Sequence, residues 1–332
     1  PILKAIGVPS EVFSEASTYL SIYFWSLIFV MIYNMGSGIL RSVGDSKRPL
    51  YFLIFSSVIN IVLDFLFVKN FGFGVAGAGY ATLIAQAISA IMVMYVLMKT
   101  EDSYKVVLKD IKFDKEILLK IIKIGLPTGF QQSIVSLSNV IVQSYINVYG
   151  ASVIAGYSVT IKIDGFVNLP LQAFNMAITT FVGQNIGAKQ YNRVKKGAYI
   201  TTFLAMVTIG FFVVIMYFFG RDFIALFNQE KDVIDAGRLM QLTFLPFYIF
   251  LPINQVINGV LRGAGRSAVP MYVMIFSFVF LRQIYLFLVT KVTSDVVYVF
   301  LGWPTTWVVC SLIFIVYFFK VQWLPQEKGA EA

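Results

Sequence analysis

Nine apolar stretches, each long enough to cross a lipid bilayer, constrain the fold of this 332-residue chain more than any other feature. A bilayer core of about 30 Å requires about 20 helical residues. By that length, spans are expected near residues 17–40, 50–68, 75–98, 117–148, 153–185, 198–219, 239–261, 269–290 and 297–319. Lipid offers the backbone no hydrogen-bond partner, so helices satisfy these stretches internally. The sequence predicts an all-α polytopic membrane protein.

The composition agrees with a membrane location and narrows the chemistry. Apolar residues make up 58% of the chain and charged residues 13%, against about 45–50% and about 25% in soluble domains. The chain has no His and one Cys, Cys310, inside an apolar stretch. These facts exclude an internal disulfide, His/Cys metal sites and Ser-His or Cys-His catalysis. We therefore expect neither an enzyme nor a resident cofactor.

The basic residues predict how the chain is oriented in the membrane. Eighteen of the 26 Lys and Arg residues fall in one set of alternate loops and six in the other. Loops rich in Lys and Arg face the cytoplasm. Pro1 should then lie outside and Ala332 inside, in a bacterial or archaeal cytoplasmic membrane. The net charge of +9 needs no nucleic acid to explain it.

A sequence motif occurs twice in the chain. Gly-x-Leu-Arg-x-x-Gly-x-Ser-x-x-Pro-x-Tyr begins at Gly38 and again at Gly259, and eleven of the 21 positions from 38 to 58 are identical to those at the same offset in the second copy. Glycine permits a tight turn and proline favours a helix start. Both copies fall on loops assigned to the cytoplasm, which predicts parallel repeats. The shared residues are Gly38, Arg41, Gly44 and Pro49, with Gly259, Arg262, Gly265 and Pro270 as their counterparts.

The separation of Gly38 from Gly259, which we call the repeat offset, also predicts the domain organisation. If the second half begins near Lys115, about a hundred residues of the first half, enough for three helices, would precede this chain. The complete protein should then have twelve spans, of which nine are present. We expect the last three helices of an N-terminal bundle in 1–98 and a cytosolic linker in 99–116. A C-terminal six-helix bundle in 117–320 and a cytosolic tail in 321–332 should follow. The linker reads either as partly amphipathic and membrane-bound or as a solvated connector.

These motifs resemble those of the multidrug and toxic compound extrusion (MATE) transporters. The resemblance is carried by the paired turns, by the segment Asn60-Ile-Val-Leu-Asp64 with Gly74 to Thr82, and by Val182-Gly183-Gln184-Asn185-Ile186-Gly187-Ala188. We interpret Gly183, Gln184 and Gly187 as close-packing residues at a helix end. The resemblance implies two six-helix bundles facing a central cavity, with efflux of organic compounds driven by Na⁺ or H⁺.

Polar residues inside the first-half spans predict a cation site. A carboxylate within lipid is costly unless a cation, proton or hydrogen bond compensates it. Asn60 lies one helical turn from Asp64, Thr82 lies on the adjoining stretch, and Asn34 could complete a set of oxygen ligands for Na⁺. The resemblance implies the same four positions. In the alternative reading, Asp64 is an interfacial carboxylate that reaches water or pairs with Lys69.

The second half offers candidates for substrate contact or gating. Gln131, Gln132 and Gln255, beside Asn254, stand where another branch of the family carries acids, and they could bind substrate or form ordinary interhelical contacts. Lys162, Asp164 and Arg282 lie inside spans. Lys162 and Asp164, two residues apart, should point in different directions. Lys162 could contact substrate, a lipid headgroup or Asp64, or form a salt bridge to another residue, and Arg282 poses the same choice.

We therefore expect a monomeric, cation-coupled antiporter that exports organic, cationic or amphipathic compounds by alternating access. Its partners would be those compounds and the bilayer, and Na⁺ or H⁺ would be the coupling ion. The alternatives are a lipid-linked oligosaccharide flippase of the same superfamily, which would require several cations lining its cavity, and a non-transporting scaffold or intramembrane enzyme. An enzyme would need a clustered acid/base or metal set.

Overall fold

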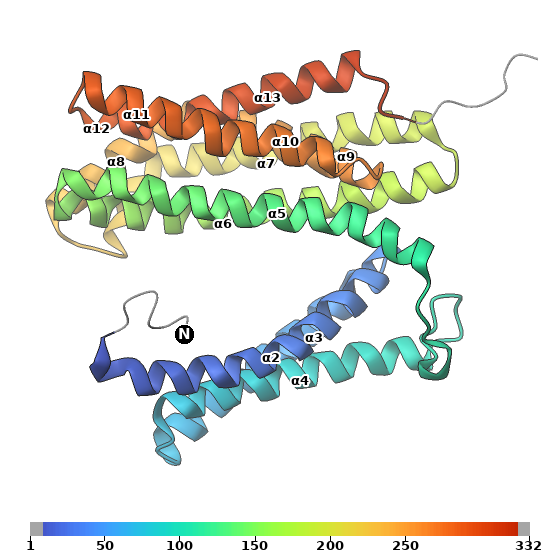
Figure 1. Ribbon diagram of the computed structural model, residues 1–332. Helices are drawn as coiled ribbons and strands as arrows, with labels where there is room; N and C mark the ends of the chain where they lie inside the picture. The colour runs from blue at the N-terminus through green and yellow to red at the C-terminus, as the bar shows by residue number, and fades with distance from the viewer. Residues whose placement is uncertain (1–8, 325–332) are drawn as a thin grey trace, which may run out of the picture. The chain divides into compact units, whose positions relative to one another are not determined.

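The computed structural model describes residues 9–324, and within that range every regular element is a helix (Figure 1). The predicted positions of Pro1 and Ala332, and most of the predicted tail, lie outside the described residues. The chain divides between Phe113 and Asp114 into two compact units. Each unit is described by itself.

The first unit is a three-helix assembly. It contains α2 (Ser10–Ser42), α3 (Lys47–Asp64) with a π-helical continuation η1 (Phe65–Asn70), α4 (Gly74–Lys99) and a 3₁₀ turn η2 (Leu108–Asp110). Helix α4 packs against both α2 and α3, whereas α2 and α3 share few contacts. Tyr33, Leu40, Phe52, Val93 and Leu97 form the core. Tyr104 and Val106 of the segment after α4 pack against this core.

The second unit contains the remaining helices. They are α5 (Lys115–Ile146), η3 (Asn147–Tyr149), α6 (Ala151–Gly187), α7 (Tyr191–Ala225), α8 (Lys231–Phe244), η4 (Leu245–Phe247), α9 (Phe250–Gly263), α10 (Ala268–Ile275), the π-helical η5 (Phe276–Leu281), α11 (Arg282–Val292), α12 (Val296–Phe300) and α13 (Gly302–Lys320). Helix α6 contacts α7, α8 and α9. The unit therefore has a central helix around which others are arranged.

The helices cover the nine predicted stretches and extend past their bounds by up to eight residues, but not all of them qualify as spans by length and hydropathy. Six are long and apolar enough to cross a membrane: Ser10–Ser42, Lys47–Asn70, Gly74–Lys99, Tyr191–Ala225, Ala268–Val292 and Val296–Lys320. A seventh span would be Lys231–Phe247 with Phe250–Gly263, a pair bent by 59°. Helices α5 and α6 are outside this set. The number of nine spans stays a prediction.

The two copies of the motif form the same turn. Gly44 and Gly265 have positive φ values of 90° and 73°, which glycine adopts without the cost that a Cβ brings. The backbone N–H of Asp45 donates to the carbonyl of Leu40 at 2.9 Å, and that of Arg266 to the carbonyl of Leu261 at 2.8 Å. A bond that spans six residues in this way is the helix-ending arrangement of a Schellman motif. The repeat read from the sequence is therefore also a repeat of backbone geometry.

Candidate functional site

Asn60 and Asp64 lie on α3, one helical turn apart and well inside the segment that qualifies as a span. The Nδ2 atom of Asn60 and the Oδ1 atom of Asp64 are buried, and neither has a hydrogen-bond partner among the described residues. The π-helical segment η1 begins directly after Asp64. Interruptions of this kind are frequent at functional sites. An acceptor and a donor, both buried, thus lie on one face of this helix, and of the two only the Asp64 oxygen can bind a cation directly.

Thr82 of α4 lies near the level of Asp64. A Cβ added to Gly77 would lie 3.1 Å from the backbone of Phe67, so η1 and the start of α4 approach closely there. Asp64 lies three residues before Phe67, and Thr82 lies five residues after Gly77. Because α3–η1 and α4 run in opposite directions, both residues lie deeper in the membrane than this contact. The Thr82 hydroxyl donates to the carbonyl of Ala78 at 3.0 Å. Its oxygen keeps lone pairs that can accept or coordinate.

The repeat does not extend to this contact. At the repeat offset, the counterparts of Ile61 and Thr82 are Arg282 and Trp303. The guanidinium carbon of Arg282 lies 5.5 Å from the centre of the Trp303 ring, whereas Ile61 is 69% exposed. Helices α3 and α4 do pack against each other, but through other residues.

Asn34 does not lie with the other three residues. Two close approaches fix the packing of α2 on α4: Gly36 against Val93 and Ile22 against Gly79. In both pairs the residue on α4 follows its partner on α2 by the same number of positions, so the two helices run in the same direction. At that interval Asn34 is level with residue 91, nine residues deeper than Thr82. At 1.5 Å per residue the separation along the helix is about 13 Å. The side chain is also exposed. The structure thus separates Asn34 from Thr82, and a ligand set of Asn60, Asp64 and Thr82 stays a prediction.

The structure gives no support to an ion pair between Asp64 and Lys69. The ammonium group of Lys69 lies over the ring of Phe65, 4.6 Å from its centre. Within residues 9–324 the ion pairs are Arg48 with Asp45 and Arg221 with Asp235. Lys69 thus has an aromatic neighbour on its own helix.

Asp164 in the second unit has hydrogen-bond donors on both carboxylate oxygens. The Tyr248 hydroxyl donates to Oδ1 at 2.5 Å, and Asn168 Nδ2 approaches Oδ2 at 3.4 Å. Lys162, two residues earlier, is exposed, and its ammonium group lies 6.0 Å from the centre of the Phe227 ring. The two side chains do point in different directions. Tyr248 is a partner that sequence reasoning missed.

Arg282 is buried, with 2% of its surface exposed. Its guanidinium donates to Asn139 Oδ1 at 2.9 Å and to Thr306 Oγ1 at 3.3 Å, and it lies over the rings of Phe278 and Trp303. No carboxylate among the described residues pairs with it, and Nε has no partner there. Neutral oxygens and aromatic faces thus stabilise this cation.

The amides of the second unit are mostly engaged with neighbouring helices. Nδ2 of Asn175 approaches the backbone oxygen of Gln255 at 2.7 Å and its Oε1 at 3.4 Å. Gln131 is buried and donates to the sulfur of Met274 at 2.8 Å, while its Oε1 is buried without a partner among the described residues. Asn254 donates to the carbonyl of Trp307 at 3.2 Å. Gln132 is exposed, so the adjacent glutamines differ in environment.

Gly183, Gln184 and Gly187 lie in the last turns of α6. Gly187 is the last residue of the helix. A Cβ added to Gly183 would lie 3.7 Å from the carbonyl of Gly263, an ordinary van der Waals distance. Gln184 accepts at its backbone carbonyl from Ala188 at 3.0 Å. Gly183 therefore faces the end of α9.

Comparison with known proteins gives concordant results. The family model described as MatE matches residues 1–66 and 127–288. "Probable multidrug resistance protein YoeA" of Bacillus subtilis (strain 168) is 30% identical over 98% of this chain, which covers 72% of that protein. "Probable multidrug resistance protein NorM" of Thermotoga maritima is 27% identical over 82% of this chain, and 59% of that protein is covered. The chain thus spans roughly three fifths to three quarters of these relatives.

Solved structures share the fold. One described as a crystal structure of MATE in the bent conformation superposes with a TM-score of 0.88 at 23% identity, covering 95% of this chain and 70% of that one. A MOP superfamily transporter from Pyrococcus furiosus, described as having a binding pocket of reverse polarity, also gives 0.88 at 22% identity, covering 95% and 71%. The all-helical architecture is therefore that of the MATE transporters.

Proposed function

The chain belongs to the MATE family of membrane transporters, and from this premise we propose that it exports organic compounds in exchange for Na⁺ or H⁺ by alternating access. Members of this family are transporters and not enzymes. The coupling residue would be Asp64, with Asn60 and Thr82 as its neighbours. Cation binding would favour one arrangement of the protein and substrate binding the other.

The observation that carries this proposal is the buried, unpartnered Oδ1 of Asp64, one helical turn from the equally unpartnered Nδ2 of Asn60. A carboxylate in that setting is stabilised by a cation or a proton. Carboxylate, amide and hydroxyl oxygens are hard ligands, of the kind that bind hard cations. Asp164 differs because Tyr248 and Asn168 donate to it. Of these two carboxylates, Asp64 is the better suited to exchange its ion.

The substrate class is proposed from the relatives. Their names describe multidrug resistance and multidrug export proteins, which supports small organic compounds, cationic or amphipathic, as the exported class. We place the protein as a monomer in the cytoplasmic membrane of a prokaryote, with its C-terminus in the cytoplasm, as the distribution of Lys and Arg suggests. A flippase site would need several accessible cations, yet Arg282 is enclosed by its partners.

The coupling free energy can be no larger than the difference in ligand affinity between the two states. If the Asp64 carboxylate supplies the difference in cation affinity, replacing it by its neutral isostere asparagine should abolish the coupling. We expect cells producing the Asp64→Asn variant to accumulate a fluorescent organic cation as strongly as cells without the transporter. The Asn60→Ala variant should retain partial export, with about tenfold weaker affinity for the driving cation, because a neutral neighbour of the carboxylate is removed while the charge remains.

The matched control is Asp110→Asn, which removes a carboxylate from the exposed segment after α4. It should export like the unmodified protein. Membrane abundance of each variant is measured in parallel. Normal export by Asp64→Asn at equal abundance would refute the assigned role of Asp64. If the flux of substrate in proteoliposomes is the same with and without imposed Na⁺ and H⁺ gradients, cation coupling itself is refuted.

A further inference from the structure

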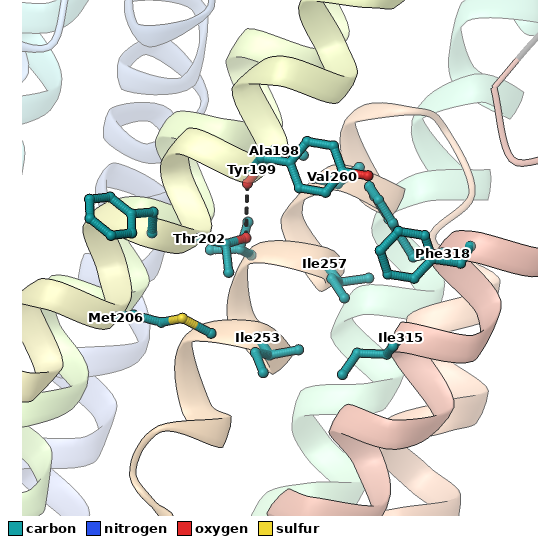
Figure 2. Close-up of a pocket in the computed structure, with 12 residues that line it drawn as sticks. Ala198, Tyr199, Thr202, Met206, Ile253, Ile257, Val260, Ile315 and Phe318 are labelled. Carbon is teal, nitrogen blue, oxygen red and sulfur yellow. Dashed lines mark hydrogen bonds between the residues drawn. The ribbon is translucent and has the colours of Figure 1, made fainter.

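An apolar groove runs along the surface of the second unit between α7, α9 and α13 (Figure 2). Its volume is about 280 Å³. Met206, Ile253, Ile257 and Ile315 point into it, and Phe318 closes one end (Figure 2). Thr202 also lines the groove, but its hydroxyl donates to the carbonyl of Ala198 at 2.8 Å. An occupant of the groove therefore meets hydrocarbon almost everywhere.

A second cavity of about 390 Å³ adjoins the groove, and the two share Phe318 and Phe319. Polar residues line it, including Asn192 and Lys195 of α7 and Lys320 at the end of α13. None of its lining residues is an acid, and neither lysine takes part in an ion pair within residues 9–324. Among the residues that the structure describes, the two positive charges of this cavity have no acidic partner.

Trp323 fixes the wall between the two cavities. Its Nε1 donates to the carbonyl of Phe318 at 3.0 Å, and its ring lies 5.0 Å from the ring of Phe318. The chain after α13 is thereby tied back over the end of the helix. Tryptophan is enriched at the boundary between hydrocarbon and water. Since the segment Val296–Lys320 that qualifies as a span also ends at this cavity, we infer that the cavity lies at the level of lipid headgroups.

The levels of the two cavities match the parts of a lipid. Lys195 is in the first turns of α7 and Lys320 is the last residue of α13. Ile315 lies five residues back from Lys320 and Met206 eleven residues beyond Lys195. At 1.5 Å per residue the groove therefore reaches about 7 Å below Lys320 along α13 and about 16 Å below Lys195 along α7, and it begins beside the lysines, at Phe319 and Ala198. Both helices belong to segments that qualify as spans.

We propose that the groove and the adjoining cavity form one binding site for a phospholipid with an anionic headgroup. The phosphate and headgroup contact Lys195 and Lys320, and one acyl chain lies along the groove over Ile253 and Ile257. Charge complementarity selects an anionic over a zwitterionic headgroup, because two cations and no acid line the cavity within residues 9–324. The bilayer is the source of this ligand, and free phosphate would leave the groove empty.

The test measures lipids retained by the purified protein in detergent by native mass spectrometry. Phosphatidylglycerol and phosphatidylcholine with identical acyl chains are added separately. The unmodified protein should retain phosphatidylglycerol more strongly, and the Lys195→Gln, Lys320→Gln double variant should lose about fivefold in affinity per lysine. The matched control removes two basic residues from the preceding loop and first turn, by Lys189→Gln and Arg193→Gln, which lie outside the cavity.

The groove has its own test. Ile253→Trp fills it and should weaken both lipids to a similar degree, whereas Val207→Trp, on an exposed face of α7 outside the groove, should weaken neither. Melting temperatures establish that the variants are folded. If the Ile253→Trp variant is not folded, the surface lysine variants alone decide the proposal. Equal retention of the two lipids, or equal losses in the lysine pair and its control, would overturn the proposal. So would displacement of phosphatidylglycerol by inorganic phosphate alone.

Discussion

Helix α2 and the pair α8–α9 occupy equivalent places in the repeat yet differ in shape. Both ends of Lys231–Gly263 lie at the repeat offset from the ends of Ser10–Ser42. Ser10–Ser42 is one unbroken helix, whereas Lys231–Gly263 is interrupted at η4 and bent by 59°. Pro246 lies at the interruption, and its counterpart in α2 is Trp25. Proline removes a backbone donor and clashes with the preceding turn. One substitution between the copies therefore introduces a helix-breaking residue at the bend.

The bend has a consequence for the polar groups. It positions Tyr248, fully buried, to stack on Trp307 at 5.6 Å and to donate to Asp164. The counterpart of Tyr248 in α2 is Leu27, which offers no donor. The second unit thus satisfies its carboxylate internally, and the first leaves Asp64 Oδ1 without a partner among the described residues. The two carboxylates occupy different positions in the repeat, because the counterpart of Asp64 is Tyr285, so the units differ in where they carry a carboxylate as well as in how it is satisfied.

The largest effect on this comparison is expected from placing a proline in α2 at the position equivalent to Pro246. We expect Trp25→Pro to kink α2 and to lower the free energy of unfolding by about 3 kcal/mol, the cost of proline inside a helix. Pro246→Ala should change it by less than about 1 kcal/mol, because burial of Tyr248 and its bond to Asp164 hold the bend without the proline. Unfolding monitored by circular dichroism in detergent gives both values.

The geometry of the bend supplies the control for that experiment. Spin labels placed at the ends of α8 and α9 should keep their separation in Pro246→Ala, and labels at the ends of α2 should move closer in Trp25→Pro. A straightened α8–α9 in Pro246→Ala would show that proline alone causes the bend and that the Tyr248 contact does not hold it.

The next comparison concerns the first glycine of each motif. A Cβ added to Gly259 would lie 2.7 Å from the carbonyl oxygen of Asn175 on α6, whereas a Cβ at Gly38 would meet nothing within 4 Å. We expect Gly259→Ala to destabilise the protein by about 1–3 kcal/mol through overpacking. Gly38→Ala should be neutral or stabilise it by up to about 1 kcal/mol, because alanine favours a helix.

Thermal unfolding of the two variants in this chain should therefore shift in different directions. A loss of stability in Gly38→Ala equal to that in Gly259→Ala would mean that both glycines are required for the turn itself, and that close packing on α6 is not the reason for Gly259.

Much of the fold could be predicted from the sequence because it follows from length and hydropathy. Each predicted stretch coincides with helix, and the repeat offset relates the bounds of α2 to those of α8–α9 as well as one motif to the other. The bend in α8–α9 was missed, although Pro246 and Pro252 were visible signals. Hydropathy records how long a segment is, but the bend angle depends on what packs against it, here Tyr248 on α6 and α13.

The candidate site could be predicted only in part, for a similar reason. Asn60 and Asp64 share a helix, so their spacing alone places them on one face. Asn34 depends on how α2 is shifted along α4, which the contacts of Gly36 with Val93 and Ile22 with Gly79 determine. Arg282 was recognised as a buried cation, but its partners Asn139 and Thr306 come from other helices. No spacing within one helix indicates such partners.

The smallest expected effect tests what the two copies share. Gly44 and Gly265 both have positive φ, and a Cβ added to either would meet nothing within 4 Å. Alanine should therefore cost about 1 kcal/mol at each position from backbone strain alone, and asparagine, which tolerates this conformation better, should cost less. Equal losses of thermal stability in Gly44→Ala and Gly265→Ala would support one turn used twice. A loss at only one position would mean that the other can change conformation, and the equivalence of the turns would then hold for sequence but not for energetics.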